Sequence, residues 1–254
     1  MKIGLVLSGG GARGIAHLGV LRALDEHEVM FSCMSGTSVG AIIGALYAQG
    51  MRPQDILEAI LQTRVLRNLR PAWTLRGLLS MESIQSLLAQ LIPHNTFEAL
   101  RLPLTVAATD LEAGRAHHFT QGALIPALLA SSCVPGMFNP VVLNGTTYVD
   151  GGITDNFPVQ AIRSNCDFII GLHCNPIVQS PQARNFRNVL ERTLLLAINS
   201  NATVSKGVCD MVIEPPQLGN FSTFELPRAR ELEELGYSYA KSFLTPDRIN
   251  TLRD

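Results

Sequence analysis

The sequence predicts an α/β fold, in which helices pack against a mainly parallel sheet. Short β-rich apolar runs alternate with segments of helical spacing along most of the chain. No linker-like tract and no internal repeat interrupts this alternation. Apolar residues make up 46% of the 254 residues and charged residues 16%, which excludes a disordered chain. We therefore expect residues 1–254 to form a single domain.

The first fifty residues contain two strand–turn–helix units. The strands are predicted at residues 2–7 and 29–34, and the helices at residues 15–25 and 39–49. Helical spacing places Leu18 and Leu21 on one face of the first helix, and Gly50 ends the second. Consecutive units of this kind predict two neighbouring parallel strands with both following turns at the same edge of the sheet.

The rest of the chain continues the alternation. Further strands are predicted at residues 104–109, 116–120, 146–149, 168–172 and 211–214. Further helices are predicted to begin at Pro53 and to span residues 82–92, 122–131, 185–201 and 226–243. The last helix carries charges that we expect on a solvated face, at Arg228, Arg230, Glu231, Glu233 and Glu234.

Composition excludes several functional classes. The formal net charge of −1 gives no basic footprint for nucleic acid. The five cysteines are odd in number, widely spaced and without a C-x-x-C pair, which predicts buried thiols rather than a disulfide framework or a metal site. The apolar run at residues 3–7 is too short for a signal peptide, and no apolar segment of 18 residues occurs. The expected location is the cytoplasm.

The first turn carries a glycine-rich motif with two interpretations. Gly9, Gly10, Gly11, Ala12, Arg13 and Gly14 satisfy G-x-G-x-x-G, the fingerprint of a dinucleotide-binding loop. That fingerprint also expects an acidic residue at the end of the next strand, where this chain has Cys33-Met34-Ser35-Gly36. The nucleotide interpretation therefore loses its second half. Arg13 is expected either to support the loop or to contact a charged substrate group.

The second turn carries a nucleophile-elbow pattern. Gly36, Thr37, Ser38, Val39 and Gly40 read G-x-S-x-G between a predicted strand and a predicted helix. Small flanking residues allow a sharp turn that exposes the Ser38 hydroxyl above the sheet edge, at the N-terminus of the following helix. The loop at residues 9–14 lies one β-α unit away at the same edge, so its uncovered amides predict an oxyanion hole beside Ser38.

A serine nucleophile needs a base at the same edge, and the residues leave two candidates. Asp150 ends a predicted strand and precedes Gly151-Gly152. His173 ends a buried strand and follows Asp150, so that Ser38, Asp150 and His173 have the chain order of an α/β-hydrolase triad. No histidine lies in a motif of its own.

Three ordered signatures resemble those of the patatin-like phospholipase family. They are Gly9–Gly14, Gly36–Gly40 and Asp150-Gly151-Gly152. Ala108–Leu111, and residues 130–135 with 138–141, are also similar to family segments. The resemblance covers about residues 1–215, and the chain looks like the compact bacterial members related to the esterase domain of neuropathy target esterase.

The resemblance implies a three-layer sandwich and a serine hydrolase that cleaves carboxylic ester bonds of lipids, as a phospholipase, lysophospholipase or esterase. Ser38 would be the nucleophile and Asp150 its base, in a dyad without histidine, while the loop at residues 9–14 would hold the oxyanion. It implies a lipid ester as partner and neither metal nor organic cofactor. The alternatives are a triad that includes His173, and a catalytically idle lipid- or nucleotide-binding module.

Two expectations follow for the base and for the surface. Free aspartate has a pKa near 3.9, and a pocket that excludes water raises it toward the useful range; an aspartate base should nevertheless keep kcat/KM high below pH 6. Residues 64–79 interleave arginines with apolar residues and the single tryptophan. They predict either a cap on the core or a peripheral contact with a membrane. No pattern in the sequence specifies an oligomeric state.

Overall fold

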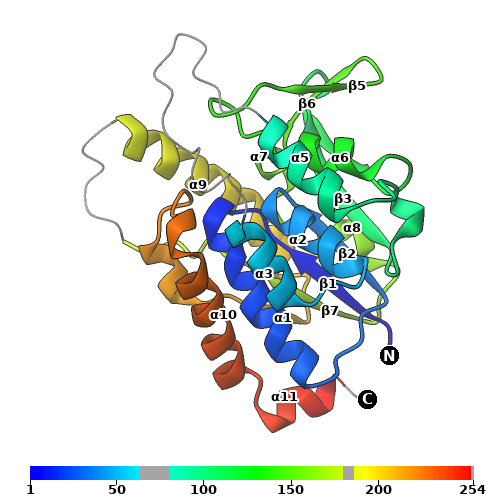
Figure 1. Cartoon of the computed structure of the whole chain (residues 1–254). Coiled ribbons are helices and arrows are strands. Elements are labelled where there is room, and N and C mark those ends of the chain that lie inside the picture. Colours follow the sequence, from blue (N-terminus) through cyan, green and yellow to red (C-terminus); the bar gives the residue numbers. More distant parts are fainter. Residues whose placement is uncertain (63–80, 180–185, 253–254) are drawn as a thin grey trace.

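A mixed sheet of eight strands forms the centre of the molecule, in a computed structural model that describes residues 1–62, 81–179 and 186–252 (Figure 1). Its strands are β1 (Ile3–Leu7), β2 (Cys33–Thr37), β3 (Leu104–Asp110), β4 (Arg115–Phe119), β5 (Val141–Leu143), β6 (Thr146–Asp150), β7 (Phe168–Leu172) and β8 (Met211–Ile213). The order is β5-β6-β3-β2-β1-β7-β8, with β4 also paired to β3. The strands from β3 to β8 in this order are parallel, so the prediction of a mainly parallel sheet is confirmed.

Helices cover both faces of the sheet. They are α1 (Ala16–Glu26), α2 (Val39–Ala48), α3 (Pro53–Gln62), α5 (Glu82–Leu91), α6 (Leu124–Ser132), α7 (Gly152–Asp155), α8 (Gln160–Arg163), α9 (Phe186–Lys206), α10 (Ala229–Phe243) and α11 (Pro246–Thr251). Short 3₁₀ turns lie at η1 (Gly11–Ile15), η2 (Phe97–Ala99), η3 (Pro216–Asn220) and η4 (Leu226–Arg228). None of the helices in the described ranges is both long and apolar enough to cross a membrane.

Successive side chains of β1 point to opposite faces of the sheet, and each face is covered by its own layer of helices. Ile3, Leu5 and Leu7 point into the large apolar core formed with α1, α2 and α10. Val6 points to the opposite face, into a second cluster that includes Ile162 of α8. Alternate residues of one strand therefore bury against different helices, which confirms the three-layer arrangement.

Glycines bring α1 and α10 close together, side by side in Figure 1. A Cβ at Gly19 would collide with the Glu233 carbonyl oxygen, and one at Gly236 would collide with the Ala16 carbonyl oxygen. This close approach buries Glu233, which is 5% exposed and ion-paired with Arg22 at 3.3 Å. The prediction of a solvated charged face is wrong for Glu233 and correct for the other four charged residues, which are exposed.

Strand β2 lies later in the sequence than its prediction. We expected residues 29–34, but β2 spans Cys33–Thr37 and pairs with β1 as far as Leu7↔Gly36. Ser35 looks like a turn residue in the sequence, yet its buried hydroxyl donates to the Pro158 carbonyl at 2.8 Å. A serine whose hydroxyl is hydrogen-bonded can lie inside a buried strand. The prediction took the residues from Ser35 on as a turn and therefore placed the strand too early. The predicted surface at residues 64–79 lies outside the described residues.

Strands β2 and β6 meet end to end along one edge of β3. Ala107 pairs with Thr37 at the end of β2, and the next residue, Ala108, pairs with Asp150 at the end of β6. Strand β4 pairs with β3 over Val106–Asp110, and so occupies the opposite edge. Parallel β2 and antiparallel β6 therefore run toward each other, and their C-terminal residues meet.

Candidate active site

Ser38 occupies the sharp turn between β2 and α2. Its backbone has φ of 54° and ψ of −128°, a conformation that few non-glycine residues adopt. A Cβ at Gly36 would lie 2.8 Å from the Gly40 carbonyl oxygen, and one at Gly40 would lie 2.5 Å from the Ser8 carbonyl oxygen. Only glycine fits at both flanks, as a nucleophile elbow requires.

Ser131 of α6 fastens this elbow to the rest of the site. Its fully buried hydroxyl accepts a hydrogen bond from the Ser38 amide at 2.8 Å and donates to the Ala107 carbonyl at 2.6 Å. Its own carbonyl accepts the Gly151 amide at 3.2 Å. One residue thus joins the turns that carry Ser38 and Asp150.

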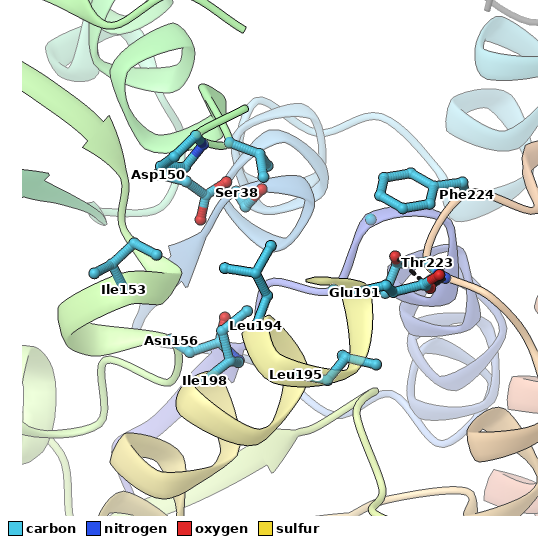
Figure 2. A pocket seen from close by; sticks show the side chains of 14 residues that line it. Ser38, Asp150, Ile153, Asn156, Glu191, Leu194, Leu195, Ile198, Thr223 and Phe224 are labelled. Atoms are coloured by element: carbon cyan, nitrogen blue, oxygen red, sulfur yellow. Dashed lines mark hydrogen bonds between the residues drawn. The ribbon is translucent and has the colours of Figure 1, made fainter. Parts of the chain in front are cut away.

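Asp150 faces Ser38 from the end of β6 (Figure 2). The side chain is buried, and its Oδ1 accepts the Gly152 amide at 2.8 Å. Its Oδ2 accepts no hydrogen bond from the residues that the structure describes. Burial raises the pKa of Asp150 to about 6, while interactions with the Ser38 side chain and the Gly152 amide oppose the rise.

The glycine-rich loop offers two uncommitted amides to the same pocket. The Gly9 amide donates to the Asn156 carbonyl at 3.2 Å, and the Ala12 amide donates to the Thr223 carbonyl at 2.8 Å. The Gly10 and Gly11 amides donate to no acceptor within the described ranges, and both residues line the pocket with Ser38 and Asp150. They are the donors available to a developing oxyanion.

Two buried side chains, those of Asn175 and Arg13, hold the loop in place. Asn175 donates through Nδ2 to the Gly9 carbonyl at 2.6 Å. A Cβ at Gly10 would lie 2.7 Å from Asn175 Oδ1, so the loop passes too close for a larger residue. Arg13 is 5% exposed, and its Nε donates to the Phe221 carbonyl at 2.7 Å. Arg13 supports the loop and is not among the residues that line the pocket.

The histidines form a separate group. His173 is fully buried, and its Nδ1 is 2.7 Å from Glu214 Oε1 rather than bonded to Asp150. Burial lowers the pKa of His173, and the hydrogen bond to Glu214 opposes this. His17 Nε2 is 3.0 Å from the Ser8 carbonyl oxygen. Neither ring lines the pocket that contains Ser38.

The wall of the pocket is mainly apolar. Helix α9 contributes Leu194, Leu195 and Ile198, which Figure 2 shows below the Ser38 and Asp150 side chains. The remaining apolar lining comes from Val134, Pro135, Ile153 and Phe224. An apolar wall beside a serine hydroxyl suits an acyl chain. No cluster of three His, Cys, Asp or Glu side chains suited to a metal ion occurs in the described parts of the chain.

Several residues of the site were missed in the sequence. Asn156 lines the pocket and is 1% exposed, and its Nδ2 lacks a partner among the described residues. Ser131 lies in a segment that we predicted as a helix and noted for its resemblance to the family, without a role in the site. Glu191 and Thr223 lie in segments without any motif. Their spacing from Ser38 along the chain carries no periodic signal, so only the fold brings them together.

The chain is similar in sequence and in fold to known proteins. Residues 5–162, more than half of the chain, match the family model described as patatin-like phospholipase. An uncharacterized NTE family protein of Mycobacterium tuberculosis is 32% identical over 206 residues, which cover 80% of this chain and 57% of that protein. Lysophospholipase nte1 of Emericella nidulans is 24% identical over 277 residues, covering 95% of this chain and 18% of that protein.

The chain thus spans little more than half of the mycobacterial relative and about a fifth of the fungal one. Among solved structures, VipD from Legionella pneumophila aligns with a TM-score of 0.57 at 16% identity, covering 96% of this chain and 66% of that one. This likeness shows a shared fold.

Proposed function

The chain belongs to the patatin-like phospholipase family, and on this premise we propose that it is a serine acyl hydrolase of lipid esters, with Ser38 as nucleophile and Asp150 as base. One observation carries the proposal. The buried Asp150 carboxylate faces Ser38 in an apolar pocket, and the Gly10 and Gly11 amides that line this pocket have no acceptor among the described residues. Nucleophile, base and oxyanion donors are the three parts that ester cleavage needs.

Acylation follows from the positions of these groups. Asp150 takes the proton from the Ser38 hydroxyl as Oγ attacks the ester carbonyl carbon. The negative charge that develops on the carbonyl oxygen is stabilised by the Gly10 and Gly11 amides and by the N-terminus of α2. When the intermediate collapses, Asp150 returns the proton to the departing alcohol, and the acyl group remains on Ser38.

Deacylation repeats the sequence with water. Asp150 accepts a proton from a water molecule that attacks the acyl-Ser38 ester, and the same amides receive the second oxyanion. Collapse returns the proton to Ser38 and releases the free acid. The proposal assigns no histidine to either step, and the raised pKa of Asp150 supports it because a carboxylate with a higher pKa is a stronger base than a free one.

The substrate class follows from the pocket wall and from the relatives. The apolar side chains of α9 suit a fatty-acyl chain, and the fungal relatives are named lysophospholipases. The proposal therefore places lysophospholipids and phospholipids first among the esters to be tested. It includes action in the cytoplasm, with peripheral membrane contact through residues 64–79 as the route to a lipid substrate.

The proposal is tested with purified protein and Ser38→Ala as the matched control. Nitrophenyl esters of increasing chain length and a panel of phospholipids and lysophospholipids are assayed together. We expect hydrolysis by the unmodified protein and none above background by Ser38→Ala, whose circular dichroism should be unchanged because one small hydroxyl leaves no core cavity. A folded protein that hydrolyses none of these esters would point instead to an idle binding module.

A further inference from the structure

Glu191 on α9 connects the wall of the pocket to the oxyanion loop. Its Oε1 accepts three hydrogen bonds of 2.8 Å, from the Ser222 hydroxyl, the Thr223 amide and the Thr223 hydroxyl. Thr223 lies between η3 and η4, outside any helix or strand. The Thr223 amide takes no part in the backbone hydrogen bonds of a helix or strand, and the Glu191 carboxylate supplies its acceptor instead.

Thr223 passes this contact on to the loop. Its carbonyl accepts the Ala12 amide at 2.8 Å. Gly11 has φ of 57°, and a Cβ there would collide with the Thr223 carbonyl oxygen. The left-handed turn of Gly11 is thus packed directly against Thr223, beside the uncommitted Gly10 and Gly11 amides. Figure 2 shows Glu191 bonded to Thr223 at the edge of the pocket.

Charge reinforces the same connection. Arg13 is buried one residue beyond Ala12 and donates to the Phe221 carbonyl, two residues before Thr223. Burial lowers the pKa of Arg13, and the negative charge of Glu191 is one of the opposing influences. Segment 221–223 is therefore held by Arg13 of the loop on one side and by Glu191 of α9 on the other.

We propose that Glu191 is a positioning residue for catalysis: through Thr223 it fixes Gly11 and Ala12, and so aims the Gly10 and Gly11 amides at the oxyanion beside Ser38. The inference rests on the proposed ester hydrolysis at Ser38. The amides act on the transition state more than on the bound ester, so a misplaced loop lowers kcat and leaves KM nearly unchanged.

The test compares Glu191→Ala with Glu191→Gln by steady-state kinetics on a nitrophenyl ester. The amide oxygen of glutamine can still accept the bonds of Ser222 and Thr223, whereas alanine cannot. We expect Glu191→Ala to lower kcat by about 10- to 100-fold with KM within about threefold, and Glu191→Gln to keep most of kcat. A KM that rises with kcat unchanged would overturn the inference, because Glu191 would then contact the substrate.

Glu112 provides a matched control. Its Oε2 accepts the Thr147 amide at 3.0 Å, so it also joins a carboxylate to a threonine, but it is exposed and does not line the pocket. Glu112→Ala should leave kcat within about twofold. An equal fall in kcat for Glu112→Ala and Glu191→Ala would contradict a specific role of Glu191.

Hydrogen exchange separates this inference from the proposed function. In Glu191→Ala the Ala12 amide should lose protection relative to the unmodified protein, whether or not the protein hydrolyses the ester offered. If Glu191→Ala does not fold, Thr223→Val removes one of the three donors and should reduce both kcat and Ala12 protection by a smaller factor. Unchanged Ala12 protection in a folded Glu191→Ala would overturn the inference.

Discussion

Burial determines the basicity of Asp150. The residue is 6% exposed, and removal of water from the carboxylate raises its pKa to about 6 from the ordinary value of 3.8. A base with this pKa is mainly ionised at neutral pH, and it accepts a proton more readily than a free aspartate does. The same desolvation should also be measurable as a cost in stability.

Replacing Asp150 by asparagine should stabilise the fold while abolishing hydrolysis. The folded chain binds the Asp150 proton more tightly than the unfolded chain, so stability falls as pH rises from about 4 to about 6. Above this window the ionised carboxylate costs about 3 kcal/mol. Urea unfolding should therefore show Asp150→Asn more stable than the unmodified protein at pH 7.5 and nearly equal to it at pH 4. An equal stability difference at both pH values would show that burial does not shift this pKa.

Substitution of His173 tests which residue is the base. If Asp150 acts alone, His173→Ala and His173→Gln should keep turnover within about fivefold, although loss of the buried ring lowers stability by about 2 kcal/mol or more. Hydrolysis rates are compared after circular dichroism shows that the variants are folded. A loss of about 10³-fold in a folded variant would instead favour a triad that includes His173.

The pH profile separates the two bases less clearly than the sequence suggested. We expected an aspartate base to stay active below pH 6, but the raised pKa moves its acid limb to about pH 6. Burial lowers the pKa of His173 from the usual value near 6.5, so a base at this position would also give a limb below pH 6.5. The Asp150 and His173 substitutions therefore distinguish an aspartate base from a histidine base better than the pH profile does.

Among the elements, the glycine-rich loop was the one that the sequence predicted best. The motif and its place between a strand and a helix were visible there. The proposed use of Gly10 and Gly11 as donors rests on their amides, which have no acceptor among the described residues. The supports of the loop were not visible, because Asn175 and Thr223 reach it from distant parts of the chain.

Substitution of Gly10 tests the loop as an element. In Gly10→Ala the new methyl group would collide with Cys174 Sγ and displace the loop. We expect turnover to fall by about 10²-fold, as for loss of an oxyanion donor. Gly207→Ala is the control, because its Cβ would meet only one ordinary contact, at 3.5 Å. Turnover rates of the two variants are compared on the same ester. Full activity of Gly10→Ala would exclude this loop from the oxyanion site.

At the scale of the whole molecule, the sheet explains why Ser38 and Asp150 meet. Periodicity and turn residues predicted most strands, but they carry no information on which strands share an edge of β3. The end-to-end meeting of β2 and β6, and the bridging role of Ser131, depend on pairings between segments far apart in the chain. For the same reason, the sequence alone left both Asp150 and His173 open as the base.

The measurement that tests the central claim most directly is labelling by a fluorophosphonate, followed by peptide mass spectrometry. Ser38 activated by Asp150 should carry the adduct in the unmodified protein and in His173→Gln. Asp150→Asn should be labelled far more slowly, and Ser38→Ala not at all. An adduct on another residue, or labelling of Asp150→Asn at the rate of the unmodified protein, would contradict a Ser38–Asp150 dyad.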